Sequence, residues 1–132
     1  SMPRFIRALL VLNAIMALSN AVVALLAPGS SLGLYGVAGG PEVFLMARYA
    51  AVGSVAIGLL AGFSSSMQPG PALRRIVLAL FASAFVGLLV SLHGTLVGLM
   101  SSAGWALVVA YGLFAAGYGG FLVGHRPGQP ED

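Results

Sequence analysis

Two side chains that can carry a positive charge lie inside long apolar segments of this sequence. Arg48 is the one formal charge within such a segment, and His93 lies near the end of another. An unpaired guanidinium inside a bilayer costs up to about 3 kcal/mol, so Arg48 must reach water or a partner. Helical side chains lean toward the N-terminus, so Arg48 either extends to the headgroups or joins His93 in one polar chamber. His93 has a plain packing role as its alternative.

Other polar side chains are expected in or near this chamber. Asn13 and Asn20 are seven residues apart and therefore share a helix face with Met16. They either hydrogen-bond across helices or contact a ligand. Tyr49 and Tyr111 fall in the same half of the membrane as Arg48. The predicted ligand-binding residues are Arg48, His93, Asn20, Asn13, Tyr49 and Tyr111.

Guanidinium, imidazole and amide groups form a donor-rich set, suited to an anion, a carbonyl or a lipid headgroup. The apolar segments hold no carboxylate, no cysteine and no second histidine. Metal hydrolysis, a carboxylate dyad and a nucleophile–base pair would each lack a component. We therefore predict no catalytic residue, no metal and no cofactor.

Composition indicates the class of protein that positions these residues. Of the 132 residues 59% are hydrophobic and 7% charged, and the mean hydropathy is +1.02. A soluble domain carries about 25% charge. The net charge of +3 comes from six arginines that do not form a patch, so no nucleic-acid partner is expected. We predict a single transmembrane domain over residues 1–132.

Prolines separate four apolar segments, which predict an all-α, four-helix transmembrane bundle with up-down topology. The expected helices are about 6–27, 43–63, 76–95 and 104–123, and the third could extend to residue 100. An outer loop, 28–42, is expected either as a flexible connector or as an interfacial lid with Tyr35 at headgroup level. Gly40, Pro41 and Glu42 are typical of a helix start.

Arginine placement predicts the orientation. The loops 28–41 and 101–103 contain no positive charge, so both termini are expected in the cytoplasm, in the inner membrane if the source is bacterial. The flanking arginines on the opposite side are Arg4, Arg7, Arg74, Arg75 and Arg126.

Small residues recur at intervals of four in three segments, which is typical of helices that pack closely in lipid. Contacts within one bundle or between protomers would both explain them. The three series are Ala50, Ser54, Gly58, Gly62; then Ala79, Ser83, Gly87, Ser91; then Gly112, Ala116, Gly120, Gly124.

Four features give the chain a resemblance to small bacterial four-helix membrane proteins of the broad DoxX-like group. They are the loop from Pro28 to Val37 with Leu34-Tyr35-Gly36, the early arginine in Ala47-Arg48-Tyr49, the Arg74-Arg75 turn and Trp105 at the last helix. Some members of that group are linked to quinone or redox systems; because this chain lacks cysteine, no thiol role is expected.

These observations predict an integral membrane protein that binds or translocates a small anionic or lipid-like molecule in an outward-facing polar pocket. The lipid bilayer, such a ligand, and further copies in a homo-oligomer are the expected partners. An alternative is a non-catalytic structural or assembly subunit of a larger membrane complex, with the small-residue series as docking faces. A membrane enzyme acting on a lipid or quinone is the third hypothesis.

Overall fold

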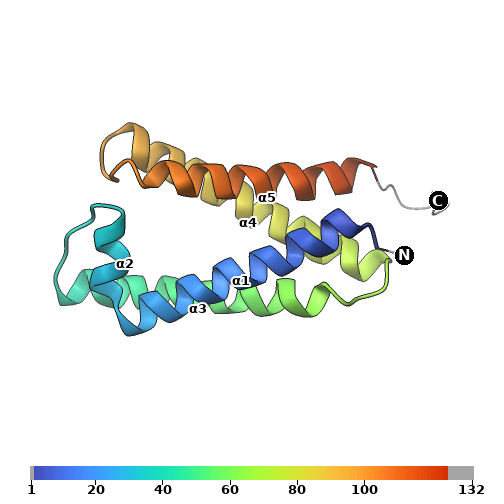
Figure 1. Cartoon of the computed structure of the whole chain (residues 1–132), viewed down its shortest axis with the longest axis horizontal. Coiled ribbons are helices and arrows are strands. Elements are labelled where there is room, and N and C mark those ends of the chain that lie inside the picture. The colour runs from blue at the N-terminus through green and yellow to red at the C-terminus, as the bar shows by residue number, and fades with distance from the viewer. Residues whose placement is uncertain (1, 125–132) are drawn as a thin grey trace.

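The computed structural model describes residues 2–124, and this part of the chain folds entirely into helices and their connections (Figure 1). The all-helical prediction is confirmed, and four helices are long and apolar enough to cross a membrane. His125 and Arg126 lie outside the described residues. The helices are α1 (Arg4–Leu26), α2 (Pro28–Leu34), α3 (Pro41–Ser64), α4 (Pro71–Leu96) and α5 (Gly104–Gly124).

Proline marks the start of α2, α3 and α4 more accurately than hydropathy does. Each of these helices has proline in its first turn, where the ring fixes φ at a helical value and no amide hydrogen is lost from the ladder. Helix α4 therefore begins at Pro71, five residues before the expected start. Glu42 lies in the first turn of α3, as the helix-start pattern indicates.

A glycine in the left-handed conformation ends α4, between the two ends that the sequence allowed. Gly98 has a φ of +81°. Its amide donates to the Thr95 carbonyl at 3.3 Å, and the Leu99 amide donates to the Gly94 carbonyl at 2.9 Å. This pair of bonds is the Schellman motif, which satisfies the last carbonyls of a helix.

The segment 28–42, expected as a loop, contains the short helix α2. Its Pro28 is buried, and a Cβ built on Gly29 would lie 3.3 Å from the ring of Phe44 on α3. The α2 backbone therefore packs directly on α3, and this contact stabilises a helix that glycine content alone would disfavour.

The long helices form two pairs, α1 with α3 and α4 with α5 (Figure 1). The pairs meet at the end where α1 begins, around the fully buried Tyr118 and Ile6. We call this the N-terminal end, and we call the opposite end, with α2 and the 97–103 turn, the loop end. Near the loop end a small cluster of Ala21, Ala24 and Ala51 joins only α1 to α3, so the pairs separate there.

Two of the three small-residue series contribute to packing inside the chain. A Cβ on Gly58 would lie 2.6 Å from Leu18 Cγ on α1, and one on Gly87 would lie 2.5 Å from the Tyr111 ring on α5. In the α5 series, a Cβ on Gly120 or Gly124 would meet no atom of the described chain within 4 Å. Helix α5 instead approaches α1 through Gly117, where a Cβ would overlap Leu9.

These contacts predict that Gly58→Ala destabilises the protein. The added methyl group overlaps Leu18, and overpacking costs about 1–3 kcal/mol, which outweighs the gain in helix propensity of about 1 kcal/mol. Gly120→Ala is the matched control and should be neutral or slightly stabilising. Thermal unfolding of both variants in the same detergent tests this, and equal midpoints would contradict the packing described.

Candidate functional site

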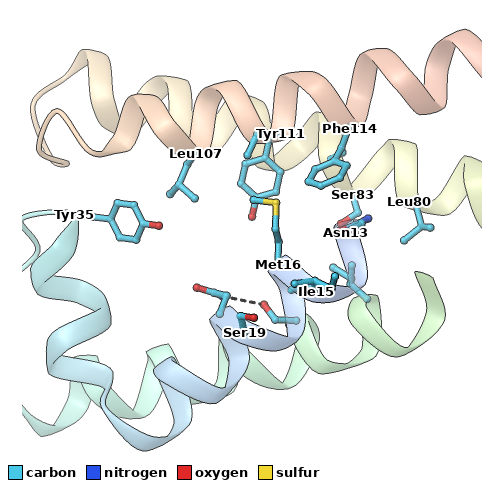
Figure 2. Close-up of a pocket in the computed structure, with 16 residues that line it drawn as sticks. Asn13, Ile15, Met16, Ser19, Tyr35, Leu80, Ser83, Leu107, Tyr111 and Phe114 are labelled. Carbon is cyan, nitrogen blue, oxygen red and sulfur yellow. Dashed lines mark hydrogen bonds between the residues drawn. The ribbon is translucent and has the colours of Figure 1, made fainter. Parts of the chain in front are cut away.

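A cavity of about 470 Å³ lies between the two helix pairs, on the loop side of the core (Figure 2). All four long helices line it, together with Tyr35, which follows α2. Its volume falls within the roughly 300–1,000 Å³ range of small-molecule pockets. The lining residues are Asn13, Ile15, Met16, Ala17, Ser19, Asn20, Tyr35, Ser54, Ile57, Leu80, Ser83, Ala84, Leu107, Ala110, Tyr111 and Phe114.

A hydrogen bond between α1 and α5 forms the floor of this cavity. Asn13 Nδ2 donates to Tyr118 Oη at 2.8 Å. Tyr118 is fully buried in the core, whereas Asn13 is half-buried and lines the cavity. The bond fixes the orientation of the amide, and Asn13 Oδ1 remains as an acceptor for a ligand.

The second asparagine lies two turns along the same face of α1. Asn20 Nδ2 is 3.4 Å from Ser54 Oγ on α3, a long hydrogen bond. Ser19 also lines the cavity, and Ser83 of α4 lies in the opposite wall. At about 1.5 Å per residue, Asn13 and Asn20 define a polar strip of about 10 Å. Both asparagines therefore bridge helices and also face the cavity, and their contact with a ligand stays a prediction.

Two tyrosines border the loop side of the cavity. The ring of Tyr111 lies over Gly87, where a β-carbon would displace it. The ring of Tyr35 points into the space between the helix pairs (Figure 2). The Tyr35 backbone is anchored, because its carbonyl accepts a 2.7 Å hydrogen bond from the Ser101 amide. Tyr35 thus covers the loop end of the cavity.

Arg48 makes a contact that the sequence did not predict. Its Nε donates to the Leu25 carbonyl at 3.2 Å. Leu25 is in the last turn of α1, where carbonyls lack helical partners and the helix dipole is negative. Arg48 is exposed and does not line the cavity. It therefore caps α1 from the neighbouring helix.

The structure brings together three of the six residues predicted to bind a ligand. Asn13, Asn20 and Tyr111 line one cavity, whereas Arg48, His93 and Tyr49 are exposed outside that lining. His93 and Tyr49 lie on different helix pairs, and the exposed fraction of Tyr49 is 66%. The ligand-binding role of all six residues stays a prediction.

Sequence reasoning did not select four polar residues of the lining: Ser19, Ser54, Ser83 and Tyr35. Ser54 and Ser83 belong to the small-residue series, where spacing indicated packing alone. Tyr35 was expected at headgroup level, either in a flexible connector or in a lid over the bundle mouth, and neither alternative made it a lining residue. A signal did exist for Ser19, which precedes Asn20 and lies about one helical turn from both Ile15 and Met16 on α1.

The cavity offers hydrogen bonds without charge. Its polar lining consists of amides and hydroxyls, and within residues 2–124 no group of three or more acidic, histidine or cysteine side chains could hold a metal ion. Such a site suits a neutral ligand with hydroxyl, carbonyl or amide groups and an apolar body.

Comparison of the chain with protein-family models, with curated proteins and with solved structures found no match. The resemblance to DoxX-like proteins therefore stays a prediction, and the function has to be argued from the cavity itself.

The cap on α1 predicts a stability effect for Arg48→Ala that does not depend on any ligand. Loss of a cation at an exposed helix C-terminus costs about 0.3–1 kcal/mol, so the unfolding midpoint should fall. Arg7→Ala, which removes an exposed arginine near the start of α1, is the control and should change the midpoint less. Thermal unfolding at low ionic strength is the measurement. Equal shifts in the two variants would refute the capping role.

Proposed function

We propose that this protein binds a small lipid-like molecule from the membrane in the cavity between its helix pairs. The observation that carries the proposal is the lining: two asparagines, three serines and two tyrosines among aliphatic and aromatic side chains. Empty, dry cavities in proteins are apolar. A polar cavity inside a membrane therefore requires hydrogen-bonding contents, and an amphipathic molecule supplies them.

The same lining favours a neutral ligand over an anionic one. Burying an anion in a low-dielectric site requires an opposite charge or a metal. Arg48 and His93 are the two cationic or titratable side chains that were expected to supply it, and both lie outside the lining. The proposal is therefore narrowed to lipid-like molecules with hydroxyl, carbonyl or amide groups.

The proposal includes an orientation in the membrane. The four apolar helices would form an up-down bundle with both termini in the cytoplasm, so that the cavity lies in the outer half of the bilayer. The arginines near the N-terminal end, Arg4, Arg7, Arg74 and Arg75, support this orientation through the positive-inside rule. Uptake from the outer leaflet, as a binding or translocating protein, is the activity that fits.

A structural role in an oligomer or larger membrane complex is the second candidate. It is favoured by the α5 series, because a Cβ on Gly120 or Gly124 would meet nothing within 4 Å among residues 2–124, so the described part of α5 has a smooth surface there. Gly58 and Gly87 are less suitable for testing this role, since both pack inside the chain. Gly120→Leu is the suitable variant: it should abolish a complex that depends on α5.

A larger side chain placed in the cavity tests whether the cavity binds a ligand. Ala110 lines the cavity, and Ala110→Phe places a ring inside it. Val109→Phe introduces the same side chain on the adjacent residue, whose exposed fraction is 60%. The ring occupies space that a ligand would fill, and a penalty on the ligand as large as core overpacking, about 1–3 kcal/mol, corresponds to roughly a 5- to 150-fold loss of affinity. Mass spectrometry of small molecules retained by protein extracted with its native lipids should show a neutral species depleted in Ala110→Phe.

Two control variants show whether a loss of ligand results from a change in the cavity or from a change elsewhere in the protein. Val109→Phe and Arg48→Ala should retain the neutral species at the wild-type level, since neither residue lines the cavity. Bulk lipid in the same proportion in wild type and Ala110→Phe would reject ligand binding and shift the search to protein partners.

A further inference from the structure

Residues that are packed or hydrogen-bonded within the chain border both ends of the cavity. At the N-terminal end the lining residues Leu80, Ala84 and Phe114 also belong to the packed core. At the loop end Tyr35 covers the cavity, and Ser101 holds that segment through its amide and through Ser101 Oγ, which donates to the Leu34 carbonyl at 3.3 Å. A ligand that entered through either end would have to break these contacts.

The exposed part of the lining lies on one side, along α1. Ile15, Met16, Ser19 and Asn20 are exposed, whereas the lining residues of α3, α4 and α5 are buried or half-buried. The cavity wall is therefore incomplete next to α1.

Helix α5 forms the other edge of this incomplete wall. Helices α1 and α5 meet at Leu9 with Gly117 and at Asn13 with Tyr118, both on the N-terminal side of Met16. Beyond these contacts the two helices diverge toward the loop end (Figure 1). The incomplete wall lies between the exposed lining residues of α1 and the half-buried lining residues of α5, and we call it the side portal: Ile15, Met16 and Ser19 on α1, with Leu107 and Tyr111 on α5.

Met16 partly closes the side portal. Its side chain extends from α1 toward Tyr111 (Figure 2), and its exposed fraction is 40%. Methionine is flexible and adaptable, and a thioether is at most a weak hydrogen-bond acceptor. Rotation of Met16 would therefore open the portal without the loss of a strong polar contact, unlike movement of Tyr35 at the loop end.

The side portal lies on the lateral surface of the helices. If the four apolar helices span a bilayer, this surface faces the lipid. We propose that a neutral, single-chain lipid of the monoacylglycerol type enters from the bilayer between α1 and α5. Its hydroxyl and ester groups contact Asn20, Ser19 and Ser54, and its hydrocarbon chain stays in the portal. This inference depends on the proposed function, and it adds the class of ligand and the route by which the ligand enters.

The size and chemistry of the cavity agree with this ligand. About 470 Å³ accommodates a glycerol head with part of a chain, but not a whole two-chain lipid. A glycerol head both donates and accepts hydrogen bonds, as do the amides and hydroxyls of the polar strip. A phosphate head would place an unpaired charge in the cavity, which is costly.

Absence of native cysteine allows a direct test by reversible cross-linking. The double variant Met16→Cys/Tyr111→Cys is bridged across the side portal with a short bis-thiosulfonate. Leu34→Cys/Ser101→Cys, at residues outside the lining, is bridged across the loop end as the matched control. Exchange of radiolabelled 1-monooleoylglycerol is measured in phosphatidylcholine nanodiscs before bridging, after bridging and after reduction.

The portal bridge should slow uptake and release at least tenfold, and reduction should restore both rates. The loop-end bridge should leave the rates unchanged. Slow exchange with the loop-end bridge and normal exchange with the portal bridge would overturn the inference and indicate access from water. Equilibrium binding of the probe before bridging separates the proposed function and ligand class from the proposed route. If the probe binds but neither bridge changes the exchange rates, only the route is wrong. Failure of the unbridged proteins and the wild type to bind it would reject the ligand class.

Discussion

The hydrogen bond from Asn13 to Tyr118 joins the two helix pairs at the point where the packed core ends and the cavity begins. On one side of it, Ile6, Leu10 and Tyr118 are fully buried. On the other side the pairs separate, and polar side chains face the space between them. If the four apolar helices span a membrane, lipid provides no hydrophobic drive to bring them together, and such a bond with the close contacts beside it determines where the pairs meet.

Close contacts at glycine hold the two helices of each pair together. Gly58 admits Leu18 between α1 and α3, and Gly87 admits the Tyr111 ring between α4 and α5. The second contact also positions a wall of the cavity. The same type of residue therefore contributes to packing and to the site, and the distinction between structural and functional residues is not sharp in this protein.

Polar groups at the loop end form hydrogen bonds that hold the helix ends. Arg48 satisfies a carbonyl at the end of α1, and Ser101 fastens the segment after α2 to the start of α5. A charge inside an apolar segment is a general indication of function in membranes. Here the negative C-terminal end of α1 lies next to Arg48 and attracts its positive charge, which explains why Arg48 lies outside the cavity.

The sequence by itself determined the helical class, the four apolar segments and the shared inward face of Asn13, Met16 and Asn20, because these depend on local hydropathy, proline and helical periodicity. It contained the signal for the end of α4 at Gly98, although apolar residues beyond it obscured that signal. The partners of Arg48, the inward turn of Tyr35 and the wall formed by Ser54 and Ser83 depend on how helices distant in sequence pack. Periodicity shows which residues share a face of one helix, but not which helix packs against that face. Only the tertiary structure therefore decided which polar residues share a cavity.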